Sequence, residues 1–306
     1  MIDKIREFWR QIDWYSSKYL LRKKIIRRTV HHMPMYLDLV TPGISKTLVI
    51  QRMREADKTL IVEEFLREGM VVLDCGSNIG YYPLLEASIV KQSGRVFAIE
   101  ADPRHYELLA KNVALAPPDV IEVFRMAVSN TVGEVTMVLA EKSNLSRVAS
   151  RTAPASNANP AETDTVTIPA TTIDAFLCDH DVEPDFVRMD IEGHEVEVLQ
   201  GMGGTLERAK RGFKILMELH PYTYSDTHNF AAELNKLFQM GFRARVIISA
   251  GGLRPKPFRD LGYRPAREIA SDGFMRGWYE GVEEHHVVEL TCSVPKVSRY
   301  VMLEKG

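Results

Sequence analysis

The feature that most constrains the fold of this chain is a short apolar run that ends in a glycine-containing loop. Residues 70–75 (MVVLDC) lead into residues 76–80 (GSNIG), and apolar residues at helical spacing follow from Tyr81. An uninterrupted apolar run is typical of a parallel strand buried on both faces. Glycines after such a strand let the backbone turn tightly and approach a ligand without a Cβ in the way. The pattern therefore predicts a strand–loop–helix unit that binds a nucleoside or a nucleotide.

Strand-like and helix-like segments alternate from about residue 60 onward. The predicted strands are residues 70–75, 95–100, 120–128, 186–190, 213–219, 242–248 and 300–303. Asp102-Pro103 predicts the start of a helix after the second strand, because aspartate caps a helix and proline fits its first position. Such alternation builds βαβ units with right-handed crossovers. We therefore expect a Rossmann-like α/β fold, with helices on both faces of a mostly parallel seven-stranded sheet.

The composition of the chain limits its expected binding partners and its expected cellular compartment. The 39 Lys and Arg residues against 41 Asp and Glu give a net charge of −2, which offers no global field for nucleic acid. The three cysteines, Cys75, Cys178 and Cys292, are far apart and form no CxxC pair, which suits a reducing cytosol. We find no apolar run long enough to span a bilayer and no secretory signal. The expectation is a cytoplasmic protein without a nucleic-acid partner or a transmembrane segment.

Residues 1–60 are expected to form a basic helical extension of the domain. Within residues 1–32, apolar side chains such as Ile5, Phe8 and Ile12 recur at roughly helical spacing among many basic residues. Such a helix most often packs on its own domain or on a second subunit, so a homo-oligomer is one of the alternatives. The alternative is a helix that lies on an anionic membrane or on a phosphate-rich substrate. We expect the packed arrangement.

Residues 61–306 are expected to form the α/β domain, with two interruptions. Residues 141–165 are rich in Ser, Ala, Asn, Thr and Pro and predict a long loop that serves as a lid or an insertion. Residues 251–286 carry several glycines, prolines and aromatic residues. We expect this second segment to cover one end of the sheet.

Glu100, twenty residues past Gly80, is predicted to bind the ribose of a cofactor. It ends the second predicted strand, where a carboxylate can accept hydrogen bonds from both ribose hydroxyls. The loop departs from the G-x-G-x-x-G spacing of dinucleotide sites, because Asn78 stands where the middle glycine would admit a pyrophosphate. Asp74, just before the loop, suits the ammonium group of a methionine moiety and would repel a pyrophosphate. The predicted cofactor-binding residues are Asp74, Gly76, Ser77, Asn78, Gly80, Glu100, Ala101 and Ala127.

A second set of polar residues follows the fourth and fifth predicted strands. Residues 184–199 (PDFVRMDIEGHEVEVL) place Asp190, Glu192 and His194 just past the fourth strand, and His220 follows the fifth. Ligands bind outside the carboxyl ends of the strands in an open α/β sheet, so these residues share one rim with Asp74 and Glu100. The alternative is that the acidic residues only stabilise the N-terminus of the following helix. We predict that Asp190, Glu192, His194 and His220 form the reaction centre.

The chain resembles the FkbM family of S-adenosylmethionine-dependent methyltransferases over roughly residues 65–245. The matching pieces are VLDCGSNIGYY, AIEADPRHYELLAKN, MAVSNTVGEV, TIPATTIDAFL, DFVRMDIEGHEVEVLQGM and ILMELHP. The D-x-E-G-H-E-x-x-x-L-x-G element is the most specific of these. The resemblance implies a class I methyltransferase domain, S-adenosylmethionine as cofactor, and O-methylation, commonly of sugars or polyketide-type products. Residues 1–60 and 251–286 lie outside the pattern, so the resemblance does not identify the acceptor.

Two mechanisms are open for such a transfer. The sulfonium of the cofactor is already a strong methyl donor, so the protein mainly has to align an acceptor oxygen with it. A neutral alcohol must also lose a proton, and His194 and His220 are the candidate bases, oriented by Asp190 or Glu192. Alternatively, the two carboxylates and a histidine hold a divalent cation that binds the substrate oxygen. We favour the mechanism without a metal.

The predicted function is therefore O-methylation of a hydroxyl on a small molecule or sugar. A nicotinamide-dependent oxidoreductase is the first alternative, and the loop spacing argues against it. A binding protein on a methyltransferase-like fold is the second alternative, since fold does not imply function. The adjacent His285 and His286 are interpreted as surface residues and not as metal ligands.

Overall fold

The computed structural model describes the chain except for residues 1, 41–42, 140–145, 149–163, 252–254 and 294–296. Its main feature is a nine-stranded sheet with the strand order β13-β14-β12-β15-β11-β10-β3-β4-β5. Seven of these strands correspond to the seven predicted from the sequence. They are β3 (Val71–Cys75), β4 (Arg95–Ile99), β5 (Ile121–Phe124), β10 (Phe186–Met189), β11 (Lys214–Glu218), β12 (Phe242–Ser249) and β15 (Ser298–Lys305).

The directions of these strands make the sheet mostly parallel, as predicted. Strands β5, β4, β3, β10 and β11 pair in parallel, whereas β15 runs antiparallel to both of its neighbours, β11 and β12. From β3 the chain continues to β4 on one side, and it later returns to β10 on the other side. The carboxyl ends of β3 and β10 therefore flank the switch point of the sheet, where open α/β folds bind ligands.

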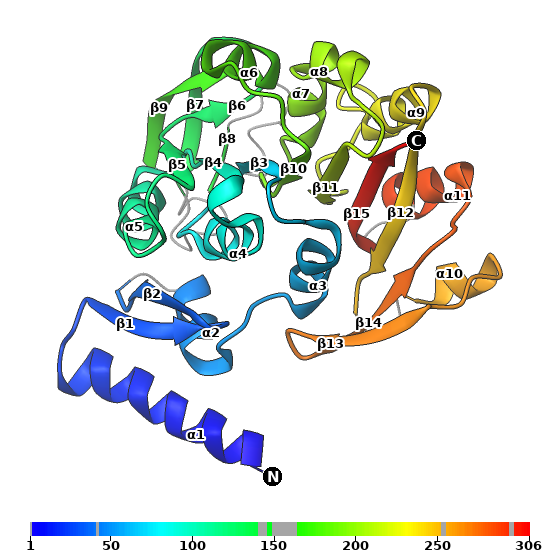
Figure 1. Cartoon of the computed structure of the whole chain (residues 1–306). Helices are drawn as coiled ribbons and strands as arrows, with labels where there is room; N and C mark the ends of the chain where they lie inside the picture. The colour runs from blue at the N-terminus through cyan, green and yellow to red at the C-terminus, as the bar shows by residue number, and fades with distance from the viewer. Residues whose placement is uncertain (1, 41–42, 140–145, 149–163, 252–254, 294–296) are drawn as a thin grey trace.

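Helices cover both faces of the sheet (Figure 1). One face packs against α3 (Ala56–Phe65), α4 (Tyr81–Val90) and α5 (Pro103–Val113), and the other packs against α6 (Ile173–His180), α7 (Glu195–Gln200), α9 (Phe230–Gln239) and α11 (Glu284–Val288). Successive residues of β3 show the two layers, since Val72 joins the first core and Leu73 the second. A strand buried on both faces has to be mostly apolar, which is why the run at 70–75 was so informative.

Two expectations about the sheet were wrong in detail. The predicted strand 120–128 is divided, because β5 ends at Phe124 and β6 (Ala127–Val128) belongs to a separate four-stranded sheet. Residues 251–286 do not simply cover an end of the main sheet. They add β13 (Arg267–Ser271) and β14 (Phe274–Tyr279) to its edge, where β14 pairs antiparallel with β12. The sheet therefore has nine strands instead of seven, and the fully buried Trp278 anchors the added hairpin.

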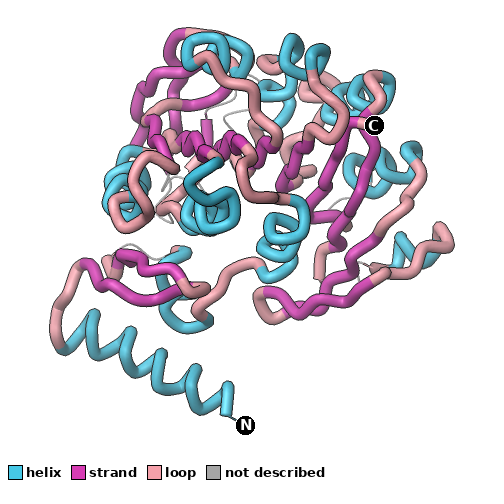
Figure 2. The backbone as a smooth tube through the Cα atoms, in the orientation of Figure 1, coloured by secondary structure: helices cyan, strands magenta, loops and turns pink. Residues whose placement is uncertain are grey.

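The small second sheet lies beside the main one and contains β6, β9 (Asp164–Thr171), β7 (Gly133–Leu139) and β8 (Arg147–Val148), in that order (Figure 2). Strands β7 and β9 form a long antiparallel pair that the sequence reading did not predict. Most of the predicted lid at 141–165 lies outside the described residues. The part that is described includes Ser146 and Val148, which line the pocket discussed below.

The first 60 residues combine helices with a β-hairpin. Helix α1 (Ile2–Tyr15) continues into a π-helical turn (Ser16–Leu20), and α2 spans Ile44–Gln51. Between them, β1 (Ile25–Val30) and β2 (Met33–Asp38) pair antiparallel, so the prediction of a purely helical extension was wrong here. Exposed residues occupy every second position of β1, and buried residues occupy every second position of β2, which is the period of two expected of a half-buried hairpin. None of the described helices is long and apolar enough to cross a membrane.

Candidate active site

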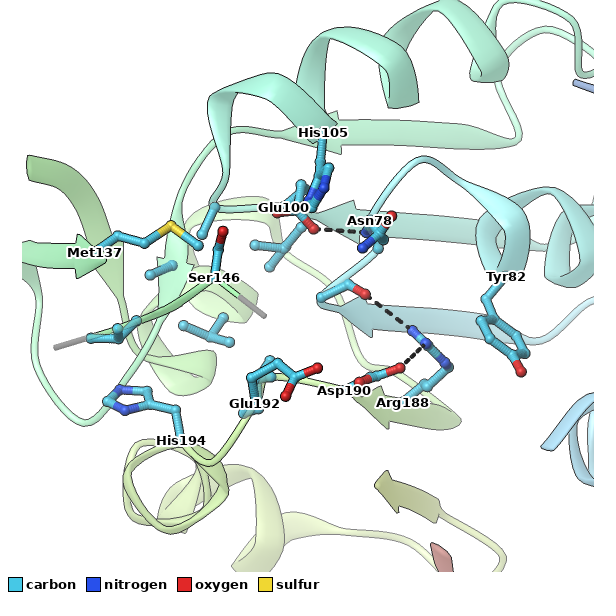
Figure 3. A pocket seen from close by; sticks show the side chains of 18 of the residues that line it. Asn78, Tyr82, Glu100, His105, Met137, Ser146, Arg188, Asp190, Glu192 and His194 are labelled. Atoms are coloured by element: carbon cyan, nitrogen blue, oxygen red, sulfur yellow. Dashed lines mark hydrogen bonds and ion pairs between the residues drawn. The ribbon is translucent and has the colours of Figure 1, made fainter. Parts of the chain in front are cut away.

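A pocket lies at the carboxyl ends of β3, β4 and β10, beside the switch point. Asn78 and Glu100 lie on one side of it, and Asp190 and Glu192 project from the end of β10 on the other (Figure 3). The predicted residues Gly76, Ser77, Asn78, Glu100, Ala101, Ala127, Asp190, Glu192 and His194 all line this pocket. The structure therefore brings together most of both predicted sets. Asp74, Gly80 and His220 are not among the residues that line this pocket.

The conformation of the glycine loop is fixed by contacts with the neighbouring strands. Gly76 has a φ of +83°, a left-handed conformation that favours glycine, and a Cβ there would collide with the backbone carbonyl of Asp190. The amides of Gly76 and Ser77 both donate to the carbonyl of Ile99 at 3.0 Å. These two N–H groups therefore fix the loop to the end of β4.

Glu100 holds the loop and the next helix together. Its Oε2 accepts a hydrogen bond from the amide of Asn78 at 2.7 Å, and its Oε1 accepts one from the amide of Asp102 at 2.7 Å. The side chain is buried, yet it lines the pocket. An ionised carboxylate has about four acceptor positions, so each oxygen keeps capacity for a ligand hydroxyl. This position matches the ribose-binding role that we predict for Glu100.

Asp74 lies differently from what was expected. Its carboxylate is fully buried and forms an ion pair with Arg188, a residue of β10 that itself lines the pocket. Burial raises the pKa of Asp74, whereas Arg188 acts in the opposite direction. Because the guanidinium of Arg188 already offsets its charge, the geometry does not support direct contact between Asp74 and a cofactor ammonium.

Asp190 takes part in a buried network of charges. Its Oδ2 accepts hydrogen bonds from Lys58 at 2.7 Å and from Arg188 at 3.0 Å. Burial opposes ionisation of Asp190, but Lys58 and Arg188 outweigh it and hold the pKa well below its ordinary range. Asp190 is therefore an anion committed to two cations, and it does not orient either of the candidate histidines.

Lys58 was not singled out from the sequence, although it is central to the site. It comes from α3, is fully buried, and also contacts Glu218 at 2.7 Å and Glu55 at 2.9 Å. Three carboxylates around one ammonium stabilise its charge despite burial, and the pKa of Lys58 is raised. Glu55, like the neighbouring Arg54, also lines the pocket. Lys58 is the third residue of α3, and a lysine in the first turn of a helix normally indicates an exposed position, so no sequence pattern pointed to its burial.

Glu192 and His220 form a second polar unit at the rim. The Nδ1 of His220 lies 2.6 Å from Oε1 of the fully buried Glu195, and its Nε2 lies 3.4 Å from Oε2 of Glu192. Burial disfavours the charged imidazole, but Glu195 overcomes this and raises the pKa of His220 to about 10. Burial also raises the pKa of Glu192 to about 7, against the opposing effect of His220. At neutral pH, a protonated His220 thus stands beside a carboxyl group that is about half ionised.

His194 occupies a different part of the pocket. Its Nε2 lies 2.9 Å from Oγ of Ser129, the residue that follows β6, and burial lowers the pKa of the imidazole. Its Nδ1 lies 3.4 Å from a carboxylate oxygen of Glu197. His194 is therefore neutral near pH 7 and is a weaker base than an ordinary histidine. Sequence reasoning had proposed both histidines as bases, whereas the structure places a carboxylate between His220 and the pocket.

Asp190, Glu192 and His220 are close enough to bind a metal ion, because one ligand atom from each lies within 4.8 Å of the others. The donor set fits such an ion poorly. Asp190 already accepts from two cations, and a histidine with a pKa near 10 holds the proton that a metal would have to displace. A second group, Glu283, His285 and His286, lies in and before α11, where Glu283 and His285 are exposed, in agreement with the surface interpretation.

The strand order and the site together define a class of protein. Numbered along the chain without the added hairpin, the seven strands run 3-2-1-4-5-7-6 with the seventh antiparallel, which is the topology of class I S-adenosylmethionine-dependent methyltransferases. Residues 74–244, more than half of the chain, match the methyltransferase FkbM domain. The chain belongs to the FkbM methyltransferase family, and the resemblance seen in the sequence is confirmed.

Known proteins similar to this chain include the hexuronic acid methyltransferase AglP of Haloferax volcanii. It is 30% identical over 168 residues, which cover 54% of this chain and 62% of that protein. The chain thus spans less than two thirds of the length of this relative. Among solved structures, methyltransferase FkbM from Methylobacillus flagellatus is 16% identical, with coverage of 76% of this chain and 52% of that one and a TM-score of 0.39. A SAM-dependent methyltransferase from Aquifex aeolicus is 19% identical, with coverage of 73% and 88% and a TM-score of 0.34.

Proposed function

We propose that this chain transfers a methyl group from S-adenosylmethionine to a hydroxyl of a small molecule or sugar. The observation that carries the proposal is the placement of Glu192. This carboxyl group lines the same pocket as Glu100, and its pKa near 7 is the value at which a general base works best at neutral pH. Family membership favours methyl transfer over the oxidoreductase alternative.

The residues around the glycine loop would hold the cofactor. Glu100 has acceptor capacity for the ribose hydroxyls, and Asn78, Ala101 and Ala127 line the same end of the pocket. When bound there, S-adenosylmethionine supplies an electrophilic methyl group on its sulfonium. The protein has to align the acceptor with that group, and alignment at ~3–3.5 Å can lower the barrier by several kcal/mol.

Glu192 would remove the proton of the acceptor hydroxyl as its oxygen becomes methylated. The O–H bond would break, with the proton passing to the carboxylate of Glu192 and the oxygen electrons forming the bond to the methyl carbon. The electron pair of the broken S–CH3 bond would remain on sulfur, so that S-adenosylhomocysteine would be the leaving product. His220, fixed by Glu195, positions this carboxylate and stabilises its ionised form. This assignment exchanges the roles first expected, since the carboxylate is the base and the histidine orients it.

A second cavity, which His220 lines, offers a place for the acceptor. It is lined by His220, Tyr222, Phe274, Arg276 and Arg299, among others. Tyr222 and Phe274 are 64% and 55% exposed, so their rings are available to stack on a ligand. Exposed aromatic rings beside polar groups suit a sugar acceptor. The two arginines of this cavity already pair with carboxylates of the chain, Arg276 with Asp57 and Arg299 with Glu55 and Glu218. The hexuronic acid in the name of the Haloferax relative supports this class of acceptor.

A direct assay tests the proposal in two steps. A thermal-shift comparison of S-adenosylhomocysteine with NAD should show stabilisation by the first only, because specific binding raises the stability of the folded state. Transfer of labelled methyl from S-adenosylmethionine to a glucuronic acid glycoside and to the matching glucoside then tests the acceptor. Stabilisation by NAD, or the lack of any labelled product with a panel of hydroxyl acceptors, would overturn the proposal.

A further inference from the structure

Helix α1 and the turn after it expose a continuous apolar face. Ile5, Phe8, Trp9, Ile12, Tyr15, Tyr19, Leu20 and Leu21 are all exposed, with Trp9 at 62% and Leu20 at 79%. The helical members follow the spacing of one helix face. This helix was expected to pack on the domain or on a second subunit, and this face does not pack on its own domain. We call these eight residues the α1 apolar face.

The opposite side of α1 fixes the helix to the rest of the protein. Trp14 is buried, and the carboxylate of Asp13 binds Arg28 of β1 through two hydrogen bonds, of 2.5 and 2.7 Å. The guanidinium of Arg10 donates to the carbonyl of Ile50 at the end of α2. Figure 1 shows α1 lying along this hairpin and α2 at one end of the molecule. The α1 apolar face is therefore turned outward by a defined contact on its other side.

Positive charge surrounds this face. Residues 1–32 contain nine Lys and Arg against three Asp and Glu, although the whole chain has slightly more acidic than basic residues. Arg22, Lys23 and Lys24 are exposed and follow Leu20 and Leu21 directly in the sequence. The ammonium of Lys18 lies over the rings of Trp14 and Tyr19 at 5.8 and 5.7 Å. Basic side chains on aromatic residues at the border of an apolar face are typical of helices at membrane interfaces.

We propose that the α1 apolar face docks on an anionic lipid bilayer, with α1 lying in the plane of the interface. Phe8, Trp9 and Ile12 would enter the boundary between head groups and acyl chains, and residues 22–24 would contact anionic head groups. A second copy of the chain is a less suitable occupant. A symmetric dimer through this face would bring two copies of the basic segment together, and their like charges would repel.

Trp9 provides a specific probe for this proposal. The chain has three tryptophans, and Trp14 and Trp278 are buried, so Trp9 is the one whose environment changes on docking. The full chain is titrated with vesicles of phosphatidylcholine alone and with vesicles that contain 30% phosphatidylglycerol. We expect a blue shift of the fluorescence and co-sedimentation with the anionic vesicles only, both reduced by high salt. The variant Trp9→Phe should still sediment with the vesicles but lose the spectral shift.

Charge-reversal variants separate the docking surface from general charge effects. Arg22→Glu/Lys23→Glu/Lys24→Glu should weaken binding to anionic vesicles by about two orders of magnitude or more, at about 1 kcal/mol per basic residue. Arg208→Glu/Lys210→Glu/Arg211→Glu is the matched control. These three exposed residues lie at and just after the end of α8 (Gly203–Arg208), at the opposite end of the molecule. Their charge reversal should leave binding within about twofold of that of the unmodified chain. Equal melting temperatures verify that both variants are folded.

Two outcomes would overturn the proposal. One is the absence of a difference between anionic and neutral vesicles for the unmodified chain. The other is a concentration-dependent dimer, seen by light scattering, that Phe8→Glu/Trp9→Glu dissociates while the unmodified chain ignores vesicles. That result would assign the α1 apolar face to a second copy of the chain.

Discussion

The two sides of the pocket are built in different ways. On the cofactor side, the loop after β3 and the end of β4 form a local unit, in which Gly76, Ser77 and Asn78 bond to Ile99 and Glu100. On the reaction side, the polar groups come from α3, β10, α7 and the end of β11. Two of them, Asp190 and Glu218, bond to Lys58, although they lie 132 and 160 residues from it in the sequence. The first side depends mainly on backbone hydrogen bonds, whereas the second depends on buried charges.

This difference has consequences for how each side responds to change. Hydrogen bonds between a loop and the next strand are largely independent of pH and of distant residues. Buried charges set the ionisation state of one another, so a change at one position alters its partners. We therefore expect substitutions on the cofactor side to have local effects, and substitutions on the reaction side to alter stability and pH dependence as well.

The largest effect on turnover is expected for Glu192→Gln. Loss of a general base typically costs about 10²–10⁴ in rate, while cofactor affinity should stay within about twofold. The ionised carboxylate is the active form. Turnover of the unmodified chain should therefore rise with pH until the pKa near 7 and fall again as His220 loses its proton near pH 10. In Glu192→Gln, the rise of turnover with pH up to about 7 should be absent.

Glu197→Gln is the matched control for this experiment, because Glu197 lies five residues further along the chain, in α7, and bonds to His228. Measurement of kcat against pH for both variants separates their effects. Normal turnover in Glu192→Gln would show that no base is needed at this position. That result would point to a carboxylate acceptor, whose oxygen carries no proton to remove.

Lys58→Met tests whether the reaction side depends on its buried cation. The change leaves Asp190, Glu218 and Glu55 buried around an uncharged residue, and removal of one partner from a buried ion network typically costs about 3–5 kcal/mol. The free energy of unfolding, measured with urea, should fall by that amount. Lys91→Met is the control, because it breaks an exposed pair with Glu68 and should cost less than about 1 kcal/mol. Equal losses of unfolding free energy in the two variants would contradict the dependence of the reaction side on its buried cation.

Glu100→Gln should weaken cofactor binding while preserving most of the fold. The amide keeps one acceptor oxygen but loses the charge, and hydrogen bonds to charged groups contribute about 1.5–3 kcal/mol each. We expect affinity for S-adenosylhomocysteine, measured by calorimetry, to fall about 10- to 100-fold. The control Glu122→Gln changes an exposed carboxylate on the neighbouring strand β5. Unchanged affinity in Glu100→Gln would remove Glu100 from the cofactor site.

The smallest effect is expected from a chelator. Asp190 is occupied by Lys58 and Arg188, and His220 is protonated, so the reaction side should act without a divalent cation. Turnover in EDTA should remain within about twofold of the untreated value. Loss of activity that Mg²⁺ or Mn²⁺ restores would instead assign a metal to Asp190, Glu192 and His220.

The cofactor side was predictable from the sequence because its geometry is local. The apolar run at 70–75, the glycine loop and Glu100 are joined by one strand–loop–helix unit, so their spacing in the chain nearly determines their spacing in space. The same applies to the helix that starts at Pro103, where the side chain of Asp102 accepts a hydrogen bond from the amide of Arg104. Asp74 was the exception, because its partner Arg188 lies on another strand.

The sequence by itself determined the alternation of strands and helices, the mostly parallel sheet and the rim on which polar residues gather. Local hydrogen bonding and hydrophobic periodicity are sufficient for these features. Only the tertiary structure decided that Lys58 neutralises Asp190, that His220 pairs with Glu195 and Glu192, and that the α1 apolar face turns outward. These outcomes depend on contacts between segments far apart in the chain. The energy of a buried charge depends on which partners reach it, and spacing along the chain does not specify those partners.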